Sequence, residues 1–408
     1  MSNVKTSIFQ KKSECCGCGA CANICPRKAI ELCEDEYGYI YPKVNKDKCI
    51  GCNLCEKVCL YKQENELLKN KVCFAAVSKD DNVCLNSASG GIFYTVAAKC
   101  LENNFICYGC EMHFANSKVI VKHSRVDNLQ DLKKLQGSKY VQSDISETFN
   151  DVKKDLINGK KVLFSGTPCQ VSSLKNYLKV LKISNINNLY TIDLICHGIP
   201  SQAMFNDYIK SIYNGFEKKD FKFRDKSKGW EHLGKIFLEK NNKIIEKKIY
   251  PKLSSYYALF LNEEIFRESC YNCKFSNKDR VGDITLGDYW GIENIYPQLL
   301  KNNKDFSKKK GISCLILNSD KGYELLELVK ECVCVYKTPY ENIIKFNQNL
   351  VKSSQKGKNR NLILKIYKKN RNFSDINKWY KKSLGFKYYA YKLWYILPSK
   401  IKKIIKNA

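Results

Sequence analysis

The chain has 408 residues, which is enough for two or three domains of roughly 100–200 residues each. Hydrophobic residues make up 44% of it and charged residues 27%, a composition that excludes global disorder and collagen-like repeats. No stretch reaches the roughly 18 uninterrupted apolar residues of a membrane-spanning helix, and residues 1–12 lack the apolar core of a secretory signal. We therefore expect a cytoplasmic protein.

The chain contains 22 cysteines and carries a formal charge of +29. In a reducing cytosol, so many cysteines indicate metal or redox use rather than disulfides. Ten of the 22 lie in the first 59 residues, whereas the last 58 residues hold 17 Lys or Arg against one Asp. This distribution predicts a cysteine-dense head, an α/β body and a basic tail.

The head is an internal repeat of the motif CxxCxxCxxxC. Its first copy recurs 34 residues later, and the two copies comprise Cys15, Cys18, Cys21, Cys25 and Cys49, Cys52, Cys55, Cys59. Between the copies, residues 36–42 predict a short hairpin with Gly38 at its turn.

Four cysteines within eleven residues do not easily surround one zinc ion, because structural zinc sites usually pair two CxxC elements across a loop. Three closely spaced cysteines suit three corners of a 4Fe-4S cluster, and the fourth reaches across to the other cluster. The predicted ligand sets are Cys15, Cys18, Cys21 and Cys59 for one cluster, and Cys49, Cys52, Cys55 and Cys25 for the other.

The flanking residues follow the bacterial ferredoxin pattern in part. Pro26 follows Cys25 as that pattern requires, whereas Leu60 stands at the position of the second proline. Zinc, or plain structural cysteines, is the alternative interpretation. Cys16 and Cys33 fall outside the spacing, and we expect them to be packing residues.

The body alternates apolar runs of strand length with helical patterns, which predicts an α/β body with a substantially parallel sheet. The predicted strands are 72–78, 105–112, 161–165, 189–195 and 312–318, and the predicted helices include 91–103, 171–181 and 321–332.

Four further cysteines follow elements of the body. Cys169 and Cys196 each come just after a predicted strand, where sites gather in a parallel sheet, and Cys270 and Cys273 form a CxxC motif. Together they make a candidate four-thiolate set. A redox-active pair or buried small residues is the alternative.

A third group suggests anion binding. Residues 87–91, Ser-Ala-Ser-Gly-Gly, open a helix after a strand, so their backbone N–H groups suit a phosphate. Helix capping by serine is the alternative. Lys139 lies in a predicted turn, where it is either a phosphate ligand or simply solvated.

Six motifs in order resemble the coenzyme F420 hydrogenase/dehydrogenase beta-subunit family, with a dicluster ferredoxin domain in front. The resemblance covers about residues 10–330, and the six motifs are Ser89-Gly-Gly91, Gly137-Ser-Lys-Tyr-Val-Gln142, Gly166-Thr-Pro-Cys-Gln170, Asp193-Leu-Ile-Cys-His-Gly198, Cys270-Tyr-Asn-Cys273 and Asp283-Ile-Thr-Leu-Gly-Asp-Tyr-Trp-Gly291.

The resemblance implies noncovalent FAD beside a third 4Fe-4S cluster held by Cys169, Cys196, Cys270 and Cys273. It makes Ser89, Gly90, Gly91, Lys139, Gly166 and Thr167 candidates for contacting FAD. His197 becomes a candidate proton donor or a structural histidine, and Asp283, Asp288 and Trp290 belong to a signature of unassigned role. The implied domains are 1–68 (dicluster), 70–150 and 151–345 (the two beta-subunit regions) and 346–408 (basic, helical tail).

The tail interleaves lysines with aromatic residues between 388 and 397. This composition suits an anionic membrane surface or an acidic protein partner. Docking of an amphipathic helix on the chain's own body is the alternative, and nucleic acid is disfavoured because the body carries no recognition motif.

We therefore predict an iron–sulfur flavoprotein oxidoreductase that exchanges electrons with ferredoxin or another low-potential carrier. Three hypotheses stay open for its reaction. It uses a deazaflavin such as coenzyme F420, it reduces an organic metabolite, or it is a non-catalytic electron-transfer subunit of a larger complex.

Overall fold

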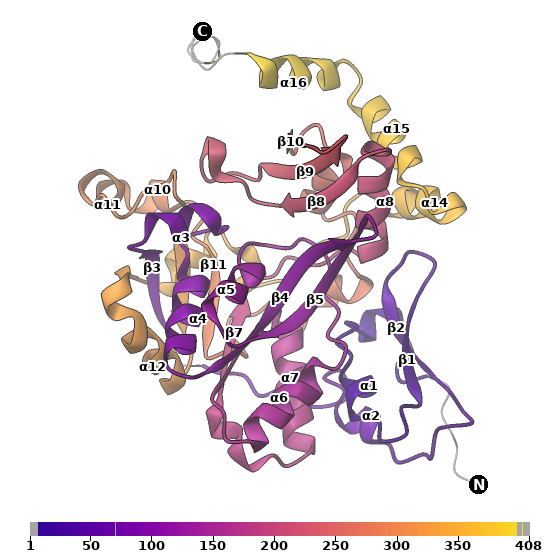
Figure 1. Ribbon diagram of the computed structural model, residues 1–408, viewed down its shortest axis with the longest axis vertical. Helices are drawn as coiled ribbons and strands as arrows, with labels where there is room; N and C mark the ends of the chain where they lie inside the picture. The colour runs from indigo at the N-terminus through magenta and orange to yellow at the C-terminus, as the bar shows by residue number, and fades with distance from the viewer. Residues whose placement is uncertain (1–6, 70, 398–401, 403–408) are drawn as a thin grey trace.

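The computed structural model describes residues 7–69, 71–397 and 402. The predicted head and tail therefore extend at both ends of the chain into residues outside the described ones. Three sheets organise the described chain, with two, three and eight strands (Figure 1).

The largest sheet has the strand order β13-β3-β12-β11-β7-β6-β4-β5. Its strands are β3 (Val72–Ser78), β4 (Ile106–Ala115), β5 (Lys118–Val126), β6 (Val162–Gly166), β7 (Leu189–Leu194), β11 (Ile284–Asp288), β12 (Ser313–Leu317) and β13 (Val333–Thr338). Five of them match the strands predicted for the body to within a few residues.

The sheet is mixed, so the expectation of a substantially parallel sheet holds only for four consecutive strands. β4, β6, β7 and β11 run parallel to one another, whereas β5, β12, β3 and β13 pair antiparallel. At one edge the reason is local. Asn116 and Ser117 both adopt positive φ, +50° and +59°, in the tight turn that reverses the chain from β4 into β5.

Helices cover both faces of this sheet. α4 (Ile92–Glu102) and α12 (Asp320–Val329) share a core with Leu163 on one face, and α6 (Thr148–Ile157) and α7 (Pro168–Val180) share a core with Phe164 on the other. β6 is buried along its whole length, as expected for a strand covered on both sides.

The head packs against the layer of α6 and α7 (Figure 1). It contains α1 (Ala20–Ile24), β1 (Ile30–Glu34), β2 (Ile40–Val44) and α2 (Leu54–Lys57). β1 and β2 form the predicted antiparallel hairpin, with Gly38 at a φ of +77° in its turn. Ala20, Ile24 and Val58 join the core of α6 and α7, so the head is continuous with the body.

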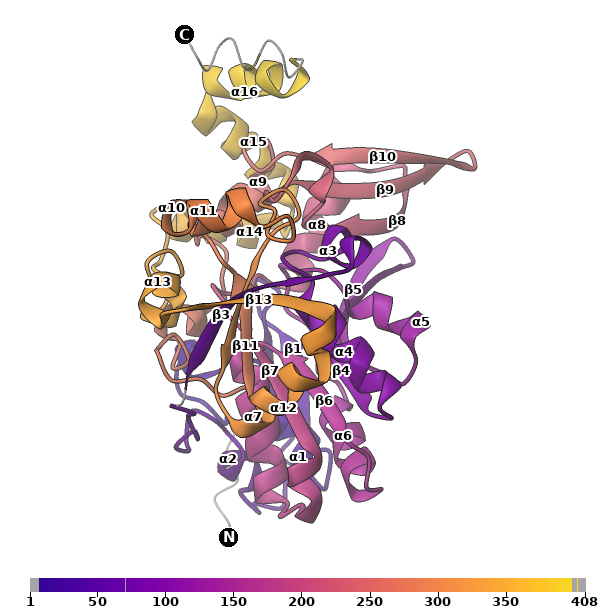
Figure 2. The same cartoon turned by 90° about the vertical axis from the view of Figure 1, so that its left-hand side faces the viewer.

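A smaller antiparallel sheet, not predicted from the sequence, has the order β10-β9-β8 (Figure 2). Its strands are β8 (Glu217–Lys222), β9 (Gly234–Lys240) and β10 (Lys243–Ile249). Phe221 and Ile236 of this sheet pack against α8 (Gln202–Ile212) and α9 (Ser255–Leu261) in a core rich in aromatic residues.

The C-terminal region contains α14 (Arg360–Asn370), α15 (Phe373–Leu384) and α16 (Phe386–Ile396). Ile363, Tyr367, Phe373 and Ile376 are buried in the same core, so α14 and the start of α15 belong to the body. α16 buries none of its residues and lies at one end of the molecule (Figure 2). Within the described chain, no helix has the length and apolar character needed to cross a membrane.

The remaining helices are short. They are α3 (Asp81–Asn86), α5 (Leu129–Leu132), α10 (Ile292–Ile295), α11 (Pro297–Asn302) and α13 (Tyr340–Ile344), together with 3₁₀ turns that include η5 (Glu268–Asn272).

Candidate iron–sulfur centres and redox site

The two cysteine motifs of the head are copies in structure as well as in sequence. Gly17 and Gly51 have φ angles of +66° and +68°, and Gly19 and Asn53 have +74° and +58°. Gly19 and Asn53 each cap the short helix that follows, α1 and α2. Left-handed residues at equivalent positions turn each loop around its cysteines.

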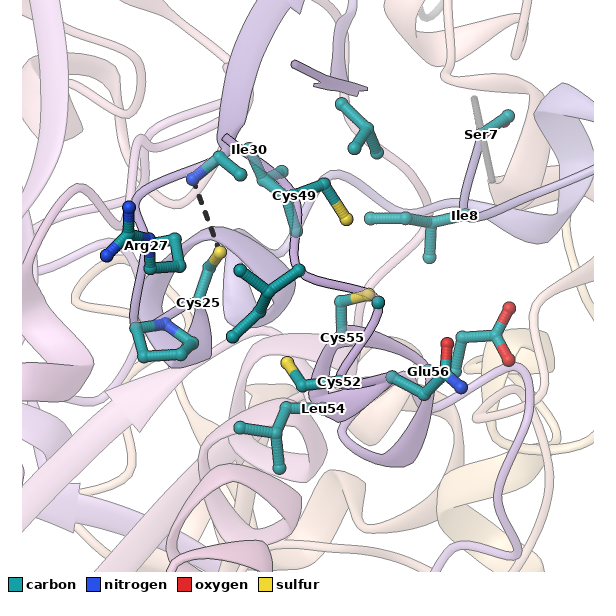
Figure 3. Close-up of a pocket in the computed structure, with 16 residues that line it drawn as sticks. Ser7, Ile8, Cys25, Arg27, Ile30, Cys49, Cys52, Leu54, Cys55 and Glu56 are labelled. Atoms are coloured by element: carbon teal, nitrogen blue, oxygen red, sulfur yellow. Dashed lines mark hydrogen bonds between the residues drawn. The ribbon is translucent and has the colours of Figure 1, made fainter. Parts of the chain in front are cut away.

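One cavity of the head is lined by Cys49, Cys52 and Cys55 together with Cys25 from the other motif (Figure 3). The backbone N–H of Ala29 donates to Cys25 Sγ over 3.3 Å, which fixes that thiol at the cavity. Cys52 and the neighbouring Ile50 are exposed. This cavity is therefore close to the protein surface.

The second cavity is lined by Cys15, Cys18 and Cys21 together with Cys59 from the other motif, and by Cys16. Each cavity thus contains three cysteines of one motif and the last cysteine of the other, which is the grouping that the crossed-ligand interpretation requires. Among the described residues, no three side chains of His, Cys, Asp or Glu converge on the position of a single metal ion.

Burial has the largest effect on the pKa values of most of these thiols. It raises the pKa of Cys21 well above its ordinary value and that of Cys59 to about 11. Cys18 is the exception, because hydrogen bonding from Cys16 lowers its pKa to about 6. Thiolates in such a site need compensating positive charge, and iron supplies it when a cluster is bound.

Arg267 of the body reaches into the second cavity's loop. Its side chain is fully buried and donates to Cys15 O (2.8 Å), Cys15 Sγ (3.7 Å), Ile40 O (2.6 Å) and Gln142 Oε1 (3.1 Å). The guanidinium also lies 4.1 Å from the centroid of the Tyr41 ring. Since Arg267 directly precedes η5, it ties the head to the segment that carries Cys270 and Cys273.

The four cysteines of the body come together at the ends of three elements. Cys169 lies in the first turn of α7, Cys196 follows β7, and Cys270 and Cys273 lie in and just after η5. Burial raises the pKa of Cys196 well above its ordinary value, and the proximity of Cys270, Cys169 and Cys273 raises it further. Thr167 Oγ1 lies 3.1 Å from Cys169 Sγ.

Cys16 connects the head to this body set. Its thiol is buried in the core, as expected of a packing residue, and interaction with Cys169 of the body and Cys18 of the head raises its pKa well above the ordinary value. Cys16 thus lies between two of the three cysteine sets. Cys33, in β1, lines neither cavity of the head.

The residues predicted to contact FAD have partners within the chain. Ser89 Oγ donates to Ile312 O, and Gly90 N donates to Ser313 Oγ. A Cβ at Gly90 would lie 2.4 Å from Ala76 O, so close packing alone requires glycine there. Gly91 adopts a φ of +82° and caps α4.

Lys139 and Thr167 are likewise held by internal bonds. Lys139 Nζ donates to the carbonyls of Lys134, Leu135 and Gln136, and burial lowers its pKa. Gln136 donates to Ser87 Oγ, so the loops at 87–91 and 136–139 lie side by side. Thr167 caps α7 in a capping box with Gln170, directly after Gly166.

A cluster that the sequence did not predict lies around Arg224. Its Nη1 donates to Asp288 Oδ2 (2.9 Å) and Tyr140 OH (3.3 Å), and its Nε donates to Glu231 O (2.8 Å). Its Nη2 is buried without a hydrogen-bond partner in the described structure. A buried donor without an acceptor in the chain is a candidate contact for a bound ligand.

Flat rings surround this arginine. Trp230 and Trp290 stack with centroids 4.7 Å apart, and His232 stacks on Trp290 at 5.4 Å. Trp230 Nε1 donates to Asp288 Oδ1, so Asp288 holds both Trp230 and Arg224 in place. Asp288 and Trp290 belong to the resemblance signature, whereas no local pattern points to Arg224, Trp230 or His232.

The two histidines of this region are neutral near pH 7. Burial lowers the pKa of His232 to about 4. Desolvation also lowers the pKa of His197, although its side chain keeps solvent-accessible surface and Asp288 opposes the shift. His197 is exposed to solvent next to Cys196, within the electrostatic reach of His232.

The other signature aspartate, Asp283, has a structural role. Its carboxylate accepts from Thr191 N (2.8 Å), Thr191 Oγ1 (2.6 Å) and Ser319 Oγ (2.6 Å). These bonds join β7, β11 and the start of α12 at the buried end of the sheet.

Comparisons with known proteins agree with this division into head and body. Residues 159–342 match the family model for the C terminus of the coenzyme F420 hydrogenase/dehydrogenase beta subunit, and residues 14–62 match the 4Fe-4S dicluster domain. The chain joins a 4Fe-4S dicluster domain to the C-terminal domain of this beta-subunit family. The family resemblance predicted from the sequence is thus confirmed, and the two domains support an iron–sulfur protein of the oxidoreductase type.

Among solved structures, a chain of the F420-reducing NiFe hydrogenase complex from Methanosarcina barkeri is similar over 76% of this chain and 91% of that chain, with 16% sequence identity and a TM-score of 0.42. No curated protein matches the chain.

Proposed function

We propose that this beta-subunit-like protein is an iron–sulfur flavoprotein oxidoreductase that connects a low-potential electron carrier, such as ferredoxin, to a hydride-carrying or organic substrate. One observation carries the proposal. The three cysteine sets are arranged in series, and Cys16 joins the head to the body by contacting Cys18 and Cys169.

The cysteine sets fit 4Fe-4S clusters, which supply one-electron transfer when bound. Cys25, Cys49, Cys52 and Cys55 would hold the outermost cluster, and their cavity near the surface suits electron exchange with a carrier. Cys15, Cys18, Cys21 and Cys59 would hold the second. Cys169, Cys196, Cys270 and Cys273 would hold the third, where the surrounding apolar core excludes water.

The Arg224 cluster fits a flavin, which exchanges either single electrons or a hydride. The unpartnered Nη2 of Arg224 offers a hydrogen bond to a flavin or substrate oxygen, and the stacked Trp230, His232 and Trp290 present flat surfaces beside it. Ser89–Gly91, Lys139 and Gly166–Thr167 stay candidates for contacts with the rest of FAD. A flavin there would have to compete with the hydrogen bonds that these groups make within the chain.

His197 is the candidate proton-transfer residue of this site. It follows Cys196 directly, its imidazole is neutral near pH 7, and it keeps access to solvent. A neutral imidazole can accept a proton at one ring nitrogen and return it to solvent.

The proposal predicts cofactor content and electron donors. Protein reconstituted anaerobically should hold about twelve irons, four for each four-cysteine set, together with one FAD. Mixed with reduced ferredoxin, the bound flavin should lose its visible absorbance rapidly. NADH and NADPH should act slowly, because the chain has no dinucleotide-binding fingerprint.

Reduced coenzyme F420 serves as the discriminating donor. Flavin reduction at a rate compatible with turnover would assign the deazaflavin reaction, whereas reduction by ferredoxin alone would favour an organic substrate or a subunit role. Protein that binds the iron but no flavin, or that is reduced fastest by NADH, would refute the proposal. Replacing Arg224 with Lys should weaken FAD binding, and iron content should stay at the wild-type level.

A further inference from the structure

α16 has two faces of different character, and one of them is docked. The Tyr395 ring stacks on Tyr250 with centroids 3.9 Å apart, and Lys252 Nζ lies 4.9 Å from the centroid of Tyr391. Because Tyr391 and Tyr395 are four residues apart, they lie on the same side of the helix. This side fixes α16 to the segment that follows β10.

The opposite side of α16 is an exposed apolar stripe. Phe386, Tyr389, Leu393 and Ile396 follow one another at spacings of three, four and three residues, which places them on one helical face. Their exposed fractions are 85%, 56%, 62% and 72%. Phe386, Ile396 and Leu393 are the three most exposed large apolar side chains of the described chain.

Positive charge surrounds the stripe. Residues 376–397 contain five lysines, at 378, 381, 382, 387 and 392, and no acidic residue. Lys387 and Lys392 are exposed and lie on the two sides of the stripe, and Lys381 and Lys382 are exposed at the end of α15. Lys243, Lys247 and Lys248 of the edge strand β10 are exposed as well.

We propose that α16 and the end of α15 bind an anionic membrane surface, with α16 lying in the plane of the interface. The apolar stripe would enter the boundary between headgroups and acyl chains, and the flanking lysines would contact anionic headgroups. Tyrosine and tryptophan, which α16 contains at five positions, favour this interface. A nucleic acid would pair with the lysines but leave Leu393 and Ile396 of the stripe without a partner.

The location of α16 fits this role. Figures 1 and 2 both place α16 at one end of the molecule and α1 and α2 of the head toward the other. Docking through α16 would therefore leave the exposed Cys52 side of the head facing away from the lipid, accessible to a soluble electron carrier. This inference goes beyond the proposed function, because it does not depend on which substrate is reduced.

The test is co-sedimentation of the full-length, cluster-loaded protein with two kinds of vesicle, pure phosphatidylcholine and phosphatidylcholine containing phosphatidylglycerol. We expect binding to the anionic vesicles, with affinity falling as salt rises. Salt shortens the distance over which exposed charges attract each other, which is about 8 Å at physiological ionic strength. Replacing Phe386 and Leu393 together with Ser should weaken binding by at least roughly tenfold. Replacing Lys387 and Lys392 together with Glu should abolish the preference for phosphatidylglycerol.

Ile157→Ser is the matched control, since Ile157 is an apolar side chain with 57% exposure at the end of α6. It should bind vesicles as the wild type does. Iron content should be unchanged in every variant, which separates loss of docking from loss of fold. Wild-type protein that does not co-sediment with anionic vesicles would refute the proposal. Binding to duplex DNA that survives the Ser replacements but not the Glu replacements would assign the surface to nucleic acid instead.

Discussion

Arg267 combines a structural and an electronic role at the Cys15 set. Its guanidinium is buried and donates to the backbone and the sulfur of Cys15 as well as to groups of β2 and of the loop at Gln142. Hydrogen bonds and positive charge at a ligand sulfur stabilise the reduced, more negative state of a cluster and raise its reduction potential. From its position in the body, Arg267 thus influences the reduction potential of the cluster that Cys15, Cys18, Cys21 and Cys59 would hold.

Arg267→Gln should therefore make the reduction potential of the Cys15 centre more negative. Arg267→Lys, which keeps the charge but loses the forked geometry, should give an intermediate value. The measurement is a redox titration followed by electron paramagnetic resonance, with iron content determined in parallel. An unchanged potential in an iron-replete Gln variant would show that Arg267 only holds the two parts of the chain together.

The sequence predicts the site best where spacing along the chain is itself the signal. The eight cysteines of the head are close in sequence, so the repeat alone gives their grouping. The body set comes from three segments spread over more than 100 residues of the sequence, so its grouping depends on the predicted strand ends and on the family resemblance. Arg224 and Trp230 carry no local pattern, because only the packing of β8 and β9 against the large sheet brings them to Asp288 and Trp290.

At the level of elements, one buried ion pair connects β7 to the loop before β11. Asp193 has no exposed surface and accepts from Arg280 Nη2 (3.1 Å), Val281 N (3.2 Å) and Gly282 N (3.1 Å). The same strand leads directly into Cys196 and His197. The position of the body cysteine set thus depends on this contact.

Asp193→Ala should lower the free energy of unfolding by about 3–5 kcal/mol, because removing one partner leaves the Arg280 charge buried and uncompensated. Urea unfolding under anaerobic conditions provides the measurement. Glu327→Ala is the control, since Glu327 forms an exposed pair with Lys330 at 2.8 Å, and such pairs contribute about 0.5 kcal/mol or less. Equal losses in the two variants would contradict the assignment.

A second element-level feature is the buried His123 of β5. Its Nε2 lies 3.0 Å from Ser165 O and its Nδ1 lies 3.0 Å from Ser143 Oγ. Since the carbonyl can only accept, Nε2 carries the proton and Nδ1 accepts from the serine. Burial lowers the pKa of His123 from 6.5 to about 4.

The lowered pKa of His123 determines whether acid stabilises or destabilises the folded protein. Between pH 6.5 and about 4 the unfolded chain binds a proton at this residue that the folded chain does not, so stability falls as pH falls. Between pH 7.5 and 5 the contribution is about 2 kcal/mol. His123→Gln should reduce the difference between urea midpoints at these two pH values, whereas His113→Gln, at an exposed position, should not. An unchanged difference in the His123 variant would contradict a neutral buried imidazole.

The elements themselves were predictable where apolar runs are long. The strands β3, β7 and β12 lie within the predicted ranges and β6 passes its range by one residue, because their side chains are mostly buried and carry the hydrophobic pattern. β8 and β10 were missed because exposed lysines and glutamates dominate them. The direction of the edge strands depends on tight turns and long connections, which periodicity does not report.

For the whole molecule, the order of the three cysteine sets implies a direction from surface to interior. The set of Cys25, Cys49, Cys52 and Cys55 is the outermost, and only it includes an exposed cysteine among the twelve predicted ligands. The charges of Cys59 and Cys55 both contribute to the raised pKa of Cys21, so the two cysteine sets of the head lie next to each other. A protein carrier would meet the outer set first, whereas a small reductant can reach any set that solvent penetrates.

Cys25→Ser tests both the crossed ligands and this order. The variant should lose about four irons, and the loss should come from the set of Cys49, Cys52 and Cys55 rather than from the motif that contains Cys25. Reduced ferredoxin should then reduce the remaining centres more slowly than in the wild type, whereas dithionite should reduce them at the wild-type rate. Cys33→Ser, which changes a head cysteine that lines neither cavity, should behave as the wild type in both assays. Loss of the Cys15 centre in the Cys25 variant would refute the crossed ligands, and undiminished reduction by ferredoxin would show that electrons enter elsewhere.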